Sequence, residues 1–217
     1  MVVVTRTYFF RIRKIVVFIG CLYLLNSCTA PKFTFEQNGI GELSFHEGKW
    51  LINDVLASKN QQDLLNHSLK KWGQVITDSL FTIDDIRKDK LISDKIKFEL
   101  NSDELSSLKL GSGCDFLINT KVDVLSEELS ALSSPRESEF GNTIRSNEVK
   151  VEIRIYDLNK HTLISSRAAF GTIKETAGEN GNNGISLALN TEGIAINGID
   201  RIIDYYTKNK KSTTSQL

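Results

Sequence analysis

Histidine is scarce in this chain, and motifs of enzymatic chemistry are missing from it. The only histidines are His46, His67 and His161, and none lies in a His-x-x-x-His or glutamate-flanked metal-binding pattern. No serine occupies the Gly-x-Ser-x-Gly pattern of a nucleophile exposed at a sharp turn. The sequence therefore predicts no catalytic residue, no metal site and no cofactor, so we do not expect an enzyme.

An excess of charge of either sign is also missing. The chain has 27 basic residues (Lys and Arg) and 27 acidic residues (Asp and Glu). Its first 27 residues contain four basic residues and no acidic one, so the remainder carries 23 basic and 27 acidic residues, a net charge of −4. This balance argues against nucleic acid, or an anionic membrane surface, as the main partner.

Long hydrophobic runs are absent as well. The main apolar run, from Ile15 to Leu25, has eleven residues, whereas a membrane-spanning helix needs roughly 20. A run of this length behind a basic segment is typical of a secretory signal peptide, whose positive charges stay in the cytoplasm. The basic residues before the run are Arg6, Arg11, Arg13 and Lys14.

The run ends in Leu25-Asn26-Ser27-Cys28. A small residue directly before a cysteine at this point is the pattern of a bacterial lipoprotein signal, in which the chain is cut before the cysteine and lipid is attached to its sulfur and new amino group. We predict that residues 1–27 are a signal peptide that is removed and that Cys28 is the lipid anchor. The alternative is a soluble secreted protein with an incidental cysteine. Because a single acyl chain binds membranes only reversibly, the two or three chains of bacterial lipoproteins are needed for durable attachment.

Cysteine is nearly absent from the rest of the chain. With Cys21 in the predicted leader and Cys28 lipidated, Cys114 is alone, and no internal disulfide is expected. Cys114 stands at the edge of an apolar strand, where a free cysteine is usually a small buried residue. A reactive thiol is the alternative, but its motif Gly111-Ser112-Gly113-Cys114 has no nearby basic partner to activate it.

The 190 residues after the leader suffice for one domain with a hydrophobic core. We predict a lipidated tether over residues 28–48, one domain of the α/β (α+β) class over 49–208 and a flexible tail over 209–217. The expected domain has a mixed sheet of about four to five strands, ends in an antiparallel hairpin and is packed by two main helices.

Two apolar stripes at helical spacing predict the main helices, and Asn101 with Glu104 predicts a capping box that opens a short third helix. His67 falls on the polar face of the first helix, where we expect it in solvent. Trp72 lies on the first stripe and is expected in the core. The stripes are Leu65, Leu69, Trp72, Ile76 and Leu80, and Ala195, Ile199, Ile202, Ile203 and Tyr206.

Alternating residues predict three antiparallel strands, over 116–124, 149–156 and 162–173, each with one buried face and one wet face. Asn119 falls on the predicted wet face. Leu43–Phe45 and Trp50–Ile52 are expected to form a short hairpin earlier in the chain.

Two polar segments lack periodicity. Residues 126–148 are rich in Ser and Glu, and a connection of this length is either disordered or functional. If it binds a partner, Phe140 is its apolar anchor. Residues 175–184 are rich in Gly and Asn and are expected to be flexible.

Two strand motifs carry a resemblance. The run Gly113-Cys114-Asp115-Phe116-Leu117 and the run Arg154-Ile155-Tyr156-Asp157, each at one end of a strand, match motifs of one α/β domain group. The chain thus resembles, over about residues 49–208, the group shared by the curli-export lipoprotein, the lipoprotein activator of penicillin-binding proteins and the amino-terminal domain of TolB.

The lipoprotein signal with an α/β domain is also similar to small envelope lipoproteins of the Bacteroidetes group. There, an acidic pair just after the lipidated cysteine accompanies surface export, and Thr29-Ala30-Pro31-Lys32 has none. The resemblance implies attachment to the outer membrane, on its periplasmic face.

These expectations favour a lipid-anchored, non-catalytic envelope protein that recruits or regulates a protein partner. The alternative is a small-molecule or glycan-binding lipoprotein, in which Trp50 or Trp72 stacks on a sugar in an open cleft. The oligomeric state is left open by the sequence.

Overall fold

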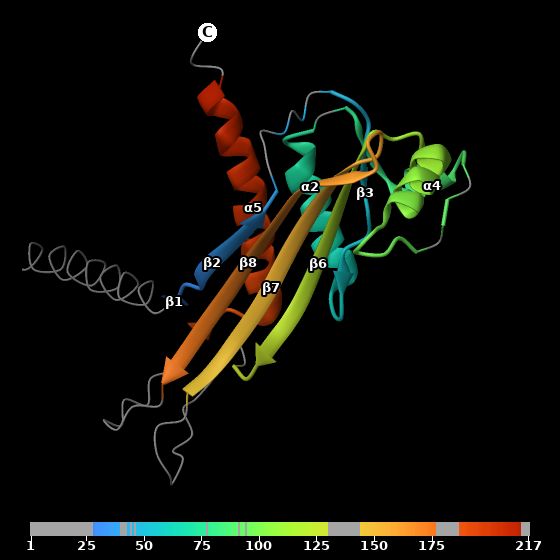
Figure 1. Cartoon of the computed structure of the whole chain (residues 1–217). Coiled ribbons are helices and arrows are strands. Elements are labelled where there is room, and N and C mark those ends of the chain that lie inside the picture. The colour runs from blue at the N-terminus through green and yellow to red at the C-terminus, as the bar shows by residue number, and fades with distance from the viewer. Residues whose placement is uncertain are drawn as a thin grey trace, which may run out of the picture.

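The computed structural model describes residues 28–39, Leu43, Phe45, 47–129 apart from 77, 91 and 94, 144–176 and 187–213. In this part of the chain a seven-stranded mixed sheet packs against helices on both faces (Figure 1). The predicted class is confirmed, but the sheet has more than the expected four to five strands, and four helices are present among these residues.

The strand order of the sheet is β2-β8-β7-β6-β3-β5, with β4 paired to β6 off this path, and β1 and β9 form a separate two-stranded ladder. The strands are β1 (Cys28–Thr29), β2 (Lys32–Asn38), β3 (Trp50–Ile52), β4 (Leu56–Ala57), β5 (Leu80–Thr82), β6 (Phe116–Glu127), β7 (Ile144–Asp157), β8 (Thr162–Thr176) and β9 (Leu187–Ala188). The helices are α2 (Gln61–Gly73), α3 (Ile83–Arg87), α4 (Ser102–Ser112) and α5 (Thr191–Thr213).

The strands β6, β7 and β8 form an antiparallel triplet, as the alternating sequence predicted, and this triplet is the centre of the sheet. β7 pairs with β8 along its whole length and with β6 from Asn147 onward. The ladders run further than expected, because β6 continues to Glu127 and β7 begins at Ile144. Both ends of the loop predicted over 126–148 are therefore strand, and Phe140 lies outside the described residues.

Residues 32–38 correct the expectation of a tether, because they form β2. This strand pairs antiparallel with β8, from Lys32 opposite Thr172 to Asn38 opposite Ser166. Its partner β8 is far along the chain, so the local sequence pattern does not predict this pairing. β2 is the edge of the sheet, and its described pairing is on the β8 side alone.

The predicted hairpin of Leu43–Phe45 with Trp50–Ile52 is wrong. Trp50–Ile52 is β3, which lies between β5 and β6 and runs parallel to both. Parallel neighbours need crossover connections, and here α2 leads from β3 to β5 while α3 and α4 lead from β5 to β6. Phe45 lies in a turn and is buried in the core.

One face of the sheet is covered by α2 and α5, as the two apolar stripes predicted. Trp72 of α2 and Ile199 of α5 are fully buried there against Ile153 and Ile155 of β7. We call this cluster of 24 buried residues the large core. It holds every predicted residue of the α5 stripe: Ala195, Ile199, Ile202, Ile203 and Tyr206.

The ends of these helices differ from the expectation. α2 ends at Gly73, so Ile76 and Leu80 lie beyond the helix. Leu80 belongs to β5, which confirms the short strand that the apolar residues of 80–83 predict. α5 continues to Thr213, beyond the domain end predicted at residue 208. Within the described ranges, every helix lacks either the length or the apolar character that a bilayer crossing requires.

The described helices and loops cover the opposite face of the sheet at one end only. Leu51, Leu117 and Tyr156 point to this face and pack with Leu105 and Leu108 of α4 in a second cluster of nine residues, which we call the small core. Since these strand residues alternate with members of the large core, the two clusters lie on opposite sides of the sheet.

Candidate functional site

The predicted lipid anchor lies at one end of the sheet. Cys28 begins β1, which pairs parallel with β9, so that Cys28 lies opposite Leu187. β2 starts four residues later, beside the end of β8. The chain at Cys28 is thus tied to the body of the domain by backbone pairing. Leu25, Asn26 and Ser27, the other predicted processing residues, lie outside the described residues.

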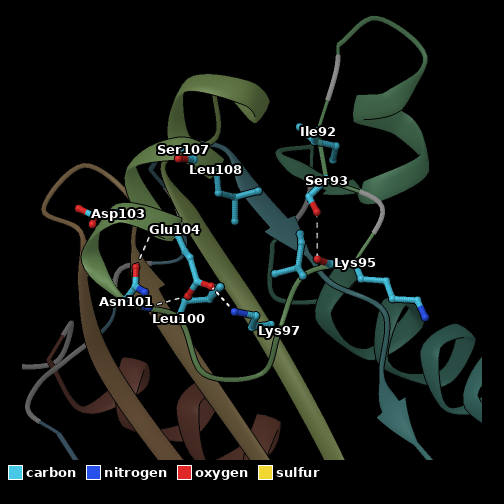
Figure 2. Close-up of a pocket in the computed structure, with 11 residues that line it drawn as sticks. Ile92, Ser93, Lys95, Lys97, Leu100, Asn101, Asp103, Glu104, Ser107 and Leu108 are labelled. Carbon is cyan, nitrogen blue, oxygen red and sulfur yellow. Dashed lines mark hydrogen bonds and ion pairs between the residues drawn. The ribbon is translucent and has the colours of Figure 1, made fainter.

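A cleft of about 510 Å³ lies at the other end of the sheet (Figure 2). It opens between α4 and the segment 92–100, with Ile96 and Leu108 of the small core among its apolar lining residues. β6 begins beside α4 and ends near β1, and a strand of this length spans about 36 Å. The full lining is Ile92, Ser93, Lys95, Ile96, Lys97, Leu100, Asn101, Asp103, Glu104, Ser107 and Leu108.

The rim of the cleft on the α4 side is a capping box, as predicted. The Glu104 backbone N–H donates to Asn101 Oδ1 (2.9 Å), and the Asn101 N–H donates to Glu104 Oε2 (3.0 Å). Lys97 Nζ donates to Glu104 Oε1 at 2.7 Å across the cleft (Figure 2). The Lys97 ammonium and then the Asn101 N–H lower the pKa of the Glu104 carboxyl, because both favour its charged form.

The opposite wall, segment 95–100, has no regular structure and is held by three side chains of the domain body. Asn119 Nδ2 donates to the Lys97 carbonyl (2.7 Å) and the Phe98 carbonyl (2.9 Å), and Tyr156 Oη donates to the same Phe98 carbonyl (3.0 Å). Asn53 Nδ2 donates to Asn119 Oδ1 (2.8 Å) and to the carbonyl of Ile96 (3.1 Å). Asn119 is fully buried, which corrects its expected place on a wet face.

The resemblance motif around Asp115 forms a junction behind the cleft. Asp115 accepts hydrogen bonds from Lys109 Nζ (2.7 Å), the Lys49 backbone N–H (2.9 Å) and Asn159 Nδ2 (3.3 Å). The Lys109 ammonium, and next the Lys49 N–H, lower the pKa of Asp115. One carboxylate therefore joins the end of α4, the start of β3 and the turn between β7 and β8.

The second motif lies next to it on β7. The Arg154 guanidinium pairs with Glu152 (2.7 Å) and Glu99 (3.0 Å) and lies over the Phe98 ring, 4.6 Å from its centroid. Asp157 accepts the backbone N–H groups of Asn159 and Lys160 and so forms the turn. The contacts of the two motifs therefore hold the cleft wall and the ends of the strands in place.

The thiol and imidazole side chains considered in the sequence, Cys114, His67 and His161, are not among the residues that line the cleft. Cys114 is buried in the small core, where burial raises the pKa of its thiol. His67 was expected in solvent but contacts Asp200 of α5, with 2.9 Å between Nε2 and Oδ1. His161 lies in the β7–β8 turn. Among the residues that the structure describes, no group of His, Cys, Asp and Glu side chains could hold a metal ion.

Trp50 and Trp72 are fully buried in the large core, so neither ring lines an open cleft. This confirms the expected core position of Trp72 and removes Trp50 from the sugar-stacking alternative. The described cleft combines an apolar floor, a charged rim and a wall held by hydrogen bonds from Asn53, Asn119 and Tyr156. Sequence reasoning missed it because its residues come from two segments without a shared motif.

Comparison with known proteins gives no matching family model and no matching curated protein. Similar solved structures include bacterial proteins at low identity, and one is a lipoprotein, GNA1162 from Neisseria meningitidis (11% identity, 77% of this chain and 99% of that chain, TM-score 0.37). Another is the PelC dodecamer from Paraburkholderia phytofirmans (9%, 81% and 97%, TM-score 0.45). A third is a neuraminyllactose-binding hemagglutinin homolog from Helicobacter pylori (10%, 82% and 100%, TM-score 0.37). Because these TM-scores are below 0.5, the similarities carry no conclusion about the function of this chain.

Proposed function

We propose that this protein is a non-catalytic envelope protein that is attached through lipid on Cys28 to the periplasmic face of the outer membrane and recruits a protein partner. The observation that carries the proposal is the position of Cys28 at the end of the sheet opposite the cleft. A lipid on Cys28 would hold the β1–β9 end next to the bilayer. The cleft would then face the periplasm, about 36 Å from the anchor by strand length.

A non-catalytic role is supported by the chemistry of the described surface. The cleft rim offers an ammonium, carboxylates and hydroxyls, and Glu104 there is already bonded to Lys97 and to a helix N-terminus. A general acid or base needs a pKa near the working pH, whereas the pKa of Glu104 is lowered from its ordinary value. These groups suit recognition of a partner.

The anchor is tested by the intact mass of the protein extracted from membranes. We expect a chain that begins at Cys28 and carries two or three acyl chains, and incorporation of labelled palmitate. Replacing Cys28 with Ala should abolish the label and release the protein from the membrane fraction. An unmodified sulfhydryl at residue 28 in membrane-extracted wild type would contradict the proposal.

Recruitment is tested by crosslinking in intact cells, followed by purification of the tagged full-length chain in detergent. We expect one envelope protein to be enriched reproducibly over a tagged unrelated lipoprotein of the same abundance. A crosslinkable side chain at Ser107 reports a partner bound at the cleft, and one at Lys70 reports a partner bound at a remote surface of α2. A tagged chain that enriches no envelope protein reproducibly would count against recruitment.

A small-molecule ligand is the second candidate function, and the cleft volume favours it. Ligand sites of proteins enclose about 300–1,000 Å³, and this cleft has about 510 Å³. Replacing Ser107 with Trp would fill it from α4. A compound that raises the melting temperature of the wild type but not of Ser107→Trp would support a ligand site, and a compound that acts on both would not.

A further inference from the structure

The edge strand β2 and helix α5 together form a second surface, away from the cleft. β2 pairs with β8 on one side, so the other side of this seven-residue strand offers backbone N–H and C=O groups. The five consecutive residues from Thr34 to Asn38 are exposed to solvent, and Phe35 among them is 40% exposed. A strand edge of this length is a template on which another chain can pair.

Aromatic rings and guanidinium groups cover the α5 side of this edge. Phe33 and Phe35 lie on the same face of β2 with their ring centroids 6.3 Å apart. The Arg201 guanidinium of α5 lies 4.8 Å from the Phe33 centroid, and Arg167 of β8 lies 5.4 Å from the Phe35 centroid. Arg167 also stacks at 3.4 Å on the ring of Tyr205. Each of the two phenyl rings therefore has a guanidinium group beside it, and the two ring–cation pairs lie two residues apart along β2.

Neither guanidinium has a carboxylate partner in the part of the chain that the structure describes. Arg167 donates to the side-chain oxygen of Gln37, and its Nε is buried without a hydrogen-bond partner. The nearest acids of α5 are engaged elsewhere, because Asp200 and Asp204 both pair with Lys71 of α2. The edge thus carries two positive charges that are not neutralised by described side chains.

We propose that an extended segment of a partner protein binds here as an added strand, with acidic side chains at two alternate positions facing Arg201 and Arg167. This proposal rests on the recruiting role and names the chemistry of the recruited segment. An added strand would lie about 4.8 Å from β2, and its alternate side chains would share one face. Arg–carboxylate pairs are charge-assisted and directional, so they fix the register of the segment.

A second copy of this chain fits the edge less well. Antiparallel pairing of β2 with its copy about Thr34 would place Lys32 opposite the Glu36 of the copy, which is favourable. On the α5 face, however, Phe33 would lie opposite the Phe35 of the copy. Arg201 would then approach the Arg167 of the copy, and four guanidinium groups would gather without a carboxylate. Charge complementarity therefore favours an acidic strand.

The test uses the full-length protein in detergent and a fluorescent peptide, Ser-Thr-Glu-Thr-Glu-Thr-Ser, with binding followed by anisotropy. We expect saturable binding that weakens about tenfold or more when Arg201, which is exposed, is replaced with Glu. The matched control Lys70→Glu makes the same charge change on α2 and should leave binding unchanged. A peptide with Lys in place of both Glu residues should not bind.

Strand pairing is tested with two N-methylated versions of the peptide. Because alternate N–H groups of a strand point to opposite sides, methylating one alternate set should abolish binding and methylating the other should not. Equal binding of both versions, or an unchanged affinity of Arg201→Glu, would overturn the proposal.

A dimer in detergent that Glu36→Lys dissociates would also overturn it, because the edge would then belong to a second copy. The peptide assay does not depend on the lipid. If Cys28 proves not to be lipidated, the peptide-binding result still stands. If the peptide does not bind, the evidence for lipidation of Cys28 still stands.

Discussion

The two faces of the sheet are built differently. The face under α2 and α5 carries the large core of 24 buried residues, whereas the opposite face carries the small core of nine, under α4 and the segment 95–100. Along a strand such as β3 the side chains alternate between the two, with Leu51 in the small core and Ile52 in the large one. The same backbone thus supplies a thick hydrophobic layer on one side and a thin one on the other.

The difference separates stability from binding. Buried apolar area stabilises a domain by roughly 25 cal/mol per Å², so most of the stabilisation comes from the large core. The small core leaves room for the cleft, whose wall is held by polar side chains such as Asn119. The thin side can therefore rearrange at a lower free-energy cost than the thick side.

The largest expected effect is on stability, and it is measured by truncating one buried side chain to alanine in each core. We expect Ile199→Ala, in the large core, to lower the free energy of unfolding by about 4 kcal/mol, since Ile199 is fully buried and its cavity cannot collapse. Leu105→Ala, beneath α4, should cost about 2 kcal/mol, because the nearby cleft lets the site relax. Urea denaturation followed by tryptophan fluorescence gives both values. Equal losses would show that the two faces contribute alike.

The second prediction concerns the polar support of the cleft wall. We expect Asn119→Ala to cost about 2 kcal/mol, because the Lys97 carbonyl loses its side-chain donor and the Phe98 carbonyl keeps only the Tyr156 hydroxyl, both in a partly buried setting. Amide hydrogen exchange over residues 95–100 should accelerate, while exchange in α5 stays slow. The control is Lys121→Ala on the same strand, which removes only an exposed ion pair with Asp123. Unchanged exchange in the wall would mean that the hydrogen bonds from Asn119 do not hold it in place.

The third prediction compares two helix N-caps. Asn101→Ala removes the side chain that accepts the Glu104 N–H at the start of α4 and should cost about 1 kcal/mol. Asn60 precedes α2 in a left-handed conformation (φ 54°) without a side-chain capping bond. Asn60→Gly keeps this conformation accessible and should lose only the exposed hydrogen bond from Asn60 Nδ2 to Glu192. Thermal unfolding of both variants is the measurement. A larger loss for the Asn60 variant would contradict the assignment of the caps.

The smallest expected effect is a pH dependence at α3, beside the small core. Lys88 first and Thr82 next lower the pKa of Asp85 from 3.8 to about 2. A lowered pKa in the folded state adds stability that is present above pH 3.8 and is lost as the pH falls toward 2. An NMR titration of the Asp85 carboxyl should have its midpoint near 2, and Lys88→Ala should raise that midpoint. A wild-type midpoint at the ordinary value would rule out the capping contacts.

Much of the fold could be predicted because it is encoded locally. The period-two alternation of β7 and the helical stripe of α5 follow from residues that are close in sequence, as does the capping box of α4. The lipid anchor is a local pattern too, and it stays a prediction that the mass of the protein will test. The resemblance to the TolB group likewise stays a prediction, although both of its motifs lie at the strand ends where they were expected.

The tertiary structure decided the features that depend on distant pairing. β2 is a strand because it pairs with β8. β3 joins the sheet by parallel pairing, which the sequence of its three residues does not predict. Asn119 is buried because segment 95–100 lies over it, and Arg167 is a binding candidate because α5 brings Tyr205 to it. Periodicity reports which side of an element is apolar, but it carries no information on which distant element covers that side. The sequence alone therefore predicted the longer helices and the antiparallel strands together with the anchor, and only packing determined β2, the parallel pairing of β3, the cleft and the edge surface.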